Sequence, residues 1–167
     1  MDGASLFRLG EDSNSGSQVE DPRKPPLAQF ATGDLFDESR QDHFIRRDGR
    51  AFAGTHLIIE VVNGTGLDDE GRIQNAFRDC VEACGATLMH IHTHRFSPHG
   101  ISGVAVLAES HISVHTWPEI GYGAFDVVMC GGAQPWRAVE VLAAAFETTD
   151  IRVKELLRGD GIVSGPA

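Results

Sequence analysis

A short segment in the second half of the chain concentrates side chains that could do chemistry. Between the carboxylates of Glu109 and Glu119 lie two serines and two histidines. Under the alternation of a β-strand these residues divide into a mainly apolar face (Ile112, Val114 and Thr116) and a polar face (His111, Ser113, His115 and Trp117). Buried polar groups need partners, so a strand at the centre of a core would not carry this second face. The pattern predicts a functional strand.

The residues around this segment resemble a known processing site. The run 108–119, with Cys130 and Gly131 downstream, is similar to the signature of the prokaryotic S-adenosylmethionine decarboxylase proenzyme. The resemblance extends from about residue 54 to residue 159 and is most specific over 102–119. It implies that the chain cuts its own backbone between Glu109 and Ser110. Ser110 would then become a pyruvoyl group, a covalent cofactor that forms a Schiff base with the substrate.

Self-cleavage makes demands on the residues around Ser110. A serine hydroxyl is a poor nucleophile, so the reaction needs backbone strain, a polarised carbonyl and a nearby base. The resemblance assigns proton transfer during processing to His115, and it assigns Ser102 to holding the ester intermediate. Because His115 lies five residues after Ser110, ideal alternation puts the two side chains on opposite faces. We therefore expect a bulge or a twist that re-aims His115.

The resemblance also implies roles in turnover and in substrate binding. Cys130 matches a cysteine that donates a proton after decarboxylation. Phe96 matches an aromatic residue that stacks on adenine, and Glu119 matches a carboxylate that binds the ribose hydroxyls. A flat apolar ring and an acceptor-only group suit these two tasks. Trp117 is expected to pack rather than to contact the substrate, and no metal is expected in the site.

The activity implied is decarboxylation of S-adenosylmethionine to S-adenosylmethioninamine and carbon dioxide, for spermidine biosynthesis. Three alternatives stay open at this point. The same self-processing chemistry serves decarboxylases of arginine or ornithine. His90, His92 and His94 share one strand face by alternation and could form a metal site with His111 or His115. A catalytically silent partner is disfavoured because Ser102, Ser110, His115 and Cys130 are all present.

The elements that must position these residues follow from hydrophobic periodicity. Asp68 or Asp69 is predicted to cap a helix that reaches about Ala83 and ends at Gly85. A second helix is predicted from Pro135 to Phe146. The strands are predicted over 55–62, 86–96, 101–108, 109–119, 124–130 and 150–157.

This order predicts an α+β fold, a mainly antiparallel sheet with two helices packed on one face. The family resemblance implies that two such protomers pair into a symmetric αββα homodimer. Residues 51–167 form the predicted decarboxylase-like domain. Residues 1–50 are predicted to be a disordered or weakly structured extension, because they carry few aliphatic side chains.

Composition restricts the partners and the compartment. The net charge of −10 disfavours nucleic acid, which requires a basic surface. No segment is apolar enough for a predicted membrane span, and no signal peptide is predicted. Three cysteines without a disulfide framework favour a reducing cytoplasm. Cys80 and Cys84, four residues apart, are expected to be small buried residues of the first helix.

Overall fold

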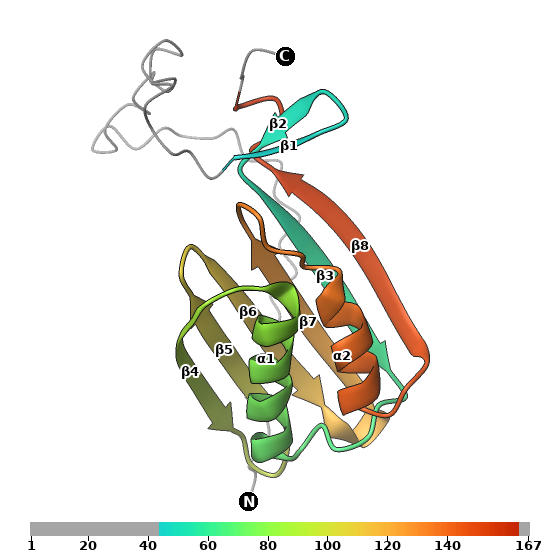
Figure 1. Cartoon of the computed structure of the whole chain (residues 1–167). Coiled ribbons are helices and arrows are strands. Elements are labelled where there is room, and N and C mark those ends of the chain that lie inside the picture. The colour runs from blue at the N-terminus through green and yellow to red at the C-terminus, as the bar shows by residue number, and fades with distance from the viewer. Residues whose placement is uncertain (1–43, 164–167) are drawn as a thin grey trace, which may run out of the picture. The chain divides into compact units, whose positions relative to one another are not determined.

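The computed structural model describes residues 44–163, which contain a six-stranded antiparallel sheet with two helices on one face (Figure 1). The strand order across the sheet is β4-β5-β6-β7-β3-β8. The strands, in chain order, are β3 (Gly54–Val62), β4 (Leu88–Arg95), β5 (Ile101–Leu107), β6 (Ser110–Trp117), β7 (Tyr122–Met129) and β8 (Asp150–Arg158). The predicted α+β class is therefore confirmed, whereas the pairing of two copies stays a prediction.

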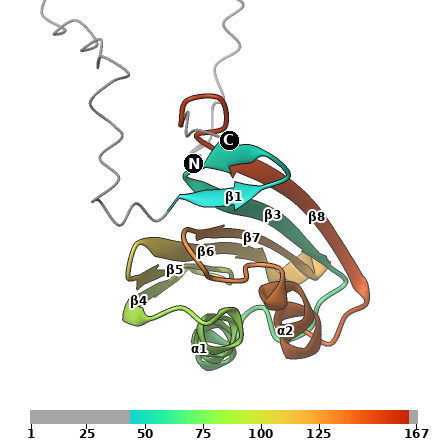
Figure 2. The same cartoon turned by 45° about the horizontal axis from the view of Figure 1, so that its top comes forward.

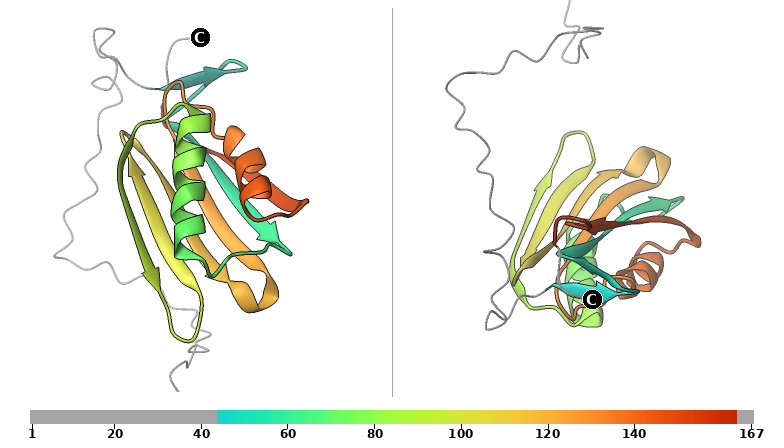
Figure 3. Two further views of the ribbon diagram at one scale, coloured as in Figure 1. Left: turned by 60° about the horizontal axis from the view of Figure 1, so that its bottom comes forward. Right: turned by 90° about the horizontal axis from the view of Figure 1, so that it is seen from above.

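Both helices begin and end close to where the sequence predicts. Helix α1 (Glu70–Cys84) is capped by Asp69, whose side chain accepts a hydrogen bond from the backbone N–H of Arg72. The helix ends at Gly85, which has a left-handed φ of 70°. Helix α2 (Arg137–Ala145) is shorter than predicted. Figures 2 and 3 show both helices against the same face of the sheet.

The core lies between the helices and this face. Alternate residues of each central strand are buried because successive side chains point to opposite faces. The buried residues of β3 and β7 are completed by the apolar stripe of α1; the largest of these side chains are Leu57, Ile59, Phe125, Met129, Ile73 and Phe77. The opposite face of β4–β7 carries mostly polar and aromatic side chains together with Val104, Val106 and Val128.

The sheet combines four strands that are consecutive in the chain with one strand, β3, that is inserted between β7 and β8. Strands β4, β5, β6 and β7 follow one another in the chain and in the sheet, whereas β3 lies between β7 and β8. The pairing of Thr55 with Met129 places the start of β3 beside the end of β7. This insertion brings Gly54 against Cys130, since a Cβ built on Gly54 would lie 3.1 Å from the Cys130 Sγ.

The predicted N-terminal extension is only partly described. Residues 1–43 lie outside the described residues. The remainder of the extension contributes to a two-stranded hairpin of β1 (Ile45–Arg47) and β2 (Arg50–Phe52). The Phe52 ring is fully buried, with the Arg47 guanidinium 5.5 Å from its centroid. Within residues 44–163, neither helix is long and apolar enough to cross a membrane.

Candidate active site

The predicted cleavage site lies in the tight turn that joins β5 to β6. Leu107 pairs with Ser110 across the two strands, so only Ala108 and Glu109 form the connection. Glu109 has a left-handed φ of 68°. For a residue with a side chain, this conformation costs on the order of 1–2 kcal/mol. The residue that precedes Ser110 is therefore strained, as self-cleavage requires.

Cys130 lies beside Ser110 at the end of β7. The Cys130 backbone N–H donates a hydrogen bond of 3.2 Å to the Ser110 Oγ. Burial of the half-buried thiol raises the pKa of Cys130, and the negative charge of Glu109 raises it further. The thiol is therefore protonated at neutral pH. The hollow at this end of the sheet is lined by residues 85–87, 108–110 and 130–133.

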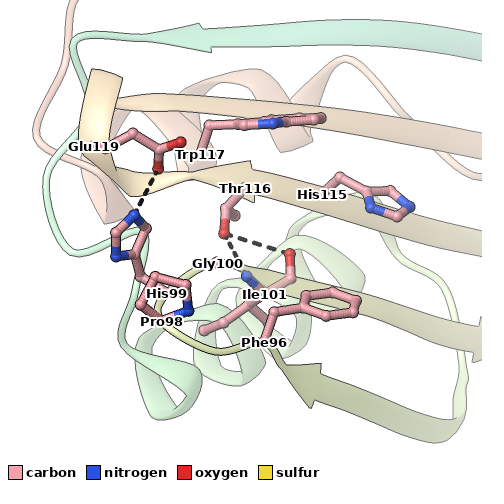
Figure 4. Close-up of a pocket in the computed structure, with 9 residues that line it drawn as sticks. All are labelled: Phe96, Pro98, His99, Gly100, Ile101, His115, Thr116, Trp117 and Glu119. Atoms are coloured by element: carbon pink, nitrogen blue, oxygen red, sulfur yellow. Dashed lines mark hydrogen bonds and ion pairs between the residues drawn. The ribbon is translucent and has the colours of Figure 1, made fainter. Parts of the chain in front are cut away.

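A pocket lies at the opposite end of β5 and β6 (Figure 4). Phe96 and Trp117 are 48% and 41% exposed, and the Trp117 ring stacks on Tyr122 with 5.2 Å between ring centroids. Glu119 lies across the pocket from these rings and forms an ion pair with His99, with 3.5 Å between His99 Nε2 and Glu119 Oε2. The whole lining comprises Phe96, Pro98, His99, Gly100, Ile101, His115, Thr116, Trp117 and Glu119.

Ser102 and His115 meet near this pocket. They are paired residues of β5 and β6, and the Ser102 Oγ lies 3.5 Å from the His115 Nε2. The predicted site residues therefore fall into two groups. The cleavage group is Glu109, Ser110 and Cys130, and the pocket group is Phe96, Ser102, His115 and Glu119.

The two groups are well separated within one chain. At about 3.3 Å per residue, the five steps from Ser110 to His115 span roughly 16 Å. Strand β6 pairs with β5 and with β7 without a register shift. Ser110 has the parity of the buried Ile112 and Val114, whereas His115 is exposed. The bulge that was expected to re-aim His115 is absent from β6, because both of its neighbours hold it in unbroken ladders.

The histidines of β4 form a row on the outer face of the sheet but do not form a metal centre. Residues His90, His92 and His94 pair with Val106, Val104 and Ser102, respectively. Within residues 44–163, no group of three or more histidine, cysteine or acidic side chains converges as metal ligands would. The His94 ring instead packs edge-on against Phe96, with 4.8 Å between ring centroids.

One polar network on the outer face was not anticipated. The Asp126 carboxylate contacts the His56 Nε2 at 2.9 Å and accepts a hydrogen bond of 3.2 Å from the Ser113 Oγ. Arg158 reaches the other ring nitrogen of His56 at 3.2 Å. Alternation puts Ser113 on the polar face, but the network also needs β3 to lie beside β7. No local signal in the sequence gives that neighbour relation.

Comparisons with known proteins show which family this chain is similar to. Residues 55–159 match the family described as S-adenosylmethionine decarboxylase. The S-adenosylmethionine decarboxylase proenzyme of Methanococcus maripaludis strain C7 is 45% identical over 109 residues, which cover 64% of this chain and 89% of the relative. That of Thermosipho melanesiensis is 40% identical over 109 residues, which cover 64% and 84%. The crystal structure of the adenosylmethionine decarboxylase from Aquifex aeolicus VF5 superposes with a TM-score of 0.61 and 30% identity, over 70% of this chain and 97% of that chain.

Proposed function

Because this chain belongs to the S-adenosylmethionine decarboxylase family, we propose that it is a self-processing, pyruvoyl-dependent decarboxylase of S-adenosylmethionine. The product would be S-adenosylmethioninamine, the aminopropyl donor for spermidine biosynthesis. One observation carries the proposal. The strained Glu109 directly precedes Ser110, and a protonated Cys130 lies beside it.

The first reaction converts Ser110. Its hydroxyl attacks the carbonyl carbon of Glu109, and the peptide bond becomes an ester. Loss of the Ser110 α-proton then breaks the ester bond. The main-chain carboxylate of Glu109 leaves as the new C-terminus, and dehydroalanine remains at position 110. Addition of one water and loss of one ammonia give the pyruvoyl group at the new N-terminus. The left-handed conformation of Glu109 favours the first step, because cleavage releases its strain.

The pyruvoyl carbonyl would condense with the substrate's amine and accept the electrons released as carbon dioxide leaves. The residues around Ser110 suit such a group. The Cys130 backbone N–H donates a hydrogen bond to the Ser110 Oγ, and Cys130 lines the same hollow as Ser110. A raised pKa keeps that thiol protonated until the decarboxylated carbon needs a proton. We assign the proton donor to Cys130.

The pocket group suits the nucleoside end of the substrate. The exposed Phe96 ring offers a flat face for adenine, and aromatic surfaces also attract the sulfonium charge. The Glu119 carboxylate can accept hydrogen bonds from two ribose hydroxyls. Arginine and ornithine have no purine or ribose for these groups. The lining therefore favours the nucleoside substrate over the basic amino acids.

A second copy of the chain would bring the two groups together. Within one chain, roughly 16 Å of strand β6 separates Ser110 from His115. A two-fold symmetric pairing sets the same surface of each copy against the other in opposite directions. The pocket group of one protomer would then face the cleavage group of its partner. We propose that the homodimer forms each site in this way and that His115 acts on the partner's cleavage group.

The three cysteines are free thiols, which suits a reducing cytoplasm.

The test of the activity is release of labelled carbon dioxide from carboxyl-labelled S-adenosylmethionine, with arginine and ornithine as parallel substrates. We expect release from S-adenosylmethionine alone, and none from a Ser110→Ala variant. Release from arginine or ornithine would contradict the substrate assignment. An active, uncleaved Ser110→Ala variant would contradict the mechanism.

A further inference from the structure

Two consecutive aspartates precede α1, and they have different partners. The Asp69 side chain caps the helix by accepting the Arg72 N–H at 3.0 Å. The Asp68 carboxylate points instead to the loop between β4 and β5. One of its oxygens accepts the Gly100 backbone N–H at 2.9 Å, and the other pairs with the Arg95 guanidinium. Asp68 therefore joins both ends of that loop.

The loop held by Asp68 carries one wall of the pocket. It closes on itself through a 2.8 Å hydrogen bond from the Phe96 N–H to the Gly100 carbonyl. The Phe96 ring and the His99 imidazole both project from it into the pocket, and His99 forms the ion pair with Glu119 (Figure 4). Both side chains are about half exposed, so packing alone does not fix them. Their positions depend on the anchored backbone.

We infer that Asp68 is a positioning residue for the nucleoside end of the substrate, an inference that rests on the proposed function. Through the Gly100 N–H and Arg95 it fixes the loop, and the fixed loop sets Phe96 and His99 against Glu119. Hydrogen bonds to a charged carboxylate are the stronger kind, which suits a clamp on a solvent-exposed loop. Asp68 does not contact the substrate itself.

The position of this clamp predicts a particular kinetic signature. Asp68 serves the pocket end of the sheet, whereas Ser110 and Cys130 lie at the opposite end of their strands. Adenine and ribose contacts are the same before and during decarboxylation. Loss of such uniform binding raises KM and leaves kcat unchanged. A general loss of structure would lower kcat and self-cleavage as well.

The test compares Asp68→Ala with Asp69→Ala, its matched neighbour. KM and kcat for S-adenosylmethionine are measured together with the extent of cleavage and the inhibition constant of 5′-methylthioadenosine. This inhibitor has the adenine and ribose but no amine to react. For Asp68→Ala we expect KM and the inhibition constant to rise about tenfold, with kcat and cleavage within about twofold of wild type. Asp69→Ala should lower the melting temperature through loss of its cap and leave both constants unchanged.

A second variant, Asp68→Asn, separates the two contacts of Asp68 and serves as the test if Asp68→Ala does not fold. Its amide oxygen can still accept the Gly100 N–H but no longer pairs with the charge of Arg95. We expect a smaller rise than for Asp68→Ala. Unchanged constants in a folded Asp68 variant, or an equal rise in Asp69→Ala, would overturn the inference. A wild-type chain that releases no carbon dioxide would overturn the proposed function. In that case, the dissociation constants of 5′-methylthioadenosine for the wild type and for the Asp68 variants, measured by calorimetry, would still test the role of Asp68.

Discussion

All three cysteines of this chain have a raised pKa, but they differ in their surroundings and in the roles that these surroundings allow. Burial raises the pKa of Cys80 and Cys84, whose thiols lie against backbone carbonyls of Ala138 and Pro135. These two residues pack α1 against α2, as small buried side chains are expected to do. Cys130 is only half-buried, and its backbone N–H contacts Ser110. The surroundings of each thiol, rather than its pKa, indicate which one can serve chemistry.

Replacing Cys130 by alanine separates cleavage from turnover. We expect Cys130→Ala to cleave at close to the wild-type extent, because Ser110 keeps its backbone hydrogen bond from position 130. Turnover should fall by about 10²- to 10⁴-fold, the usual contribution of a general acid, and protonation at the wrong carbon should inactivate the enzyme. Gel electrophoresis and carbon dioxide release measure the two effects. Full turnover without side reaction would refute the donor assignment.

The pH profile of the wild-type chain follows from the same group. A thiol donates only below its pKa, and the pKa of Cys130 is raised above the ordinary value of 9.0. Proton donation should therefore be near its maximum around neutral pH, and it should fall to half only above about pH 9. The product-forming fraction of turnovers, measured against inactivation, reports this directly. A decline centred near neutral pH would show that another group donates the proton.

At the scale of elements, the neighbour relation of β3 and β7 supports the candidate site. A Cβ on Gly54 would lie 2.9 Å from the Met129 carbonyl oxygen and 3.1 Å from the Cys130 Sγ. Gly54→Ala should therefore displace Cys130, lower the free energy of unfolding by about 1–3 kcal/mol and reduce turnover. Gly132→Ala, on the loop after Cys130, is the matched control because its Cβ meets nothing within 4 Å. Equal denaturation midpoints and rates for the two variants would contradict this packing.

Local patterns predict the elements better than they predict their neighbours. The two faces of β6 and the end of α1 at Gly85 follow from alternation and capping. Sequence alone leaves Asp68 and Asp69 as equal cap candidates, because the choice depends on a loop more than 25 residues away. The insertion of β3 between β7 and β8 is a long-range pairing that no local signal specifies.

At the scale of the whole molecule, the division into two groups predicts complementation between inactive variants. A heterodimer of Ser110→Ala and His115→Ala would combine both changes in one site and leave the other site intact. Random pairing should therefore restore about a quarter of wild-type activity, since half of the dimers are mixed and each has one intact site. Co-expression followed by the carbon dioxide assay measures this recovery. No recovery in confirmed heterodimers would place both residues in the site of a single chain.

This separation is also where prediction from sequence reached its limit. The roles implied for Ser110 and His115 require them to cooperate, and a bulge in one strand was the available solution. The unbroken ladders on both sides of β6 exclude that solution. The proposed symmetric pairing would satisfy the same requirement without distorting the strand. A single sequence carries no direct signal for such an arrangement, because its contacts would lie between two copies of the chain.

Intact mass under denaturing conditions tests the self-processing of Ser110 most directly. We predict two chains, with the break between Glu109 and Ser110, whose masses sum to that of the precursor plus one water minus one ammonia. The second chain should carry a carbonyl that borohydride reduces. A single unbroken chain that persists through long incubation would contradict self-processing. Two chains whose masses sum to the precursor plus one water alone would indicate simple hydrolysis without formation of a pyruvoyl group.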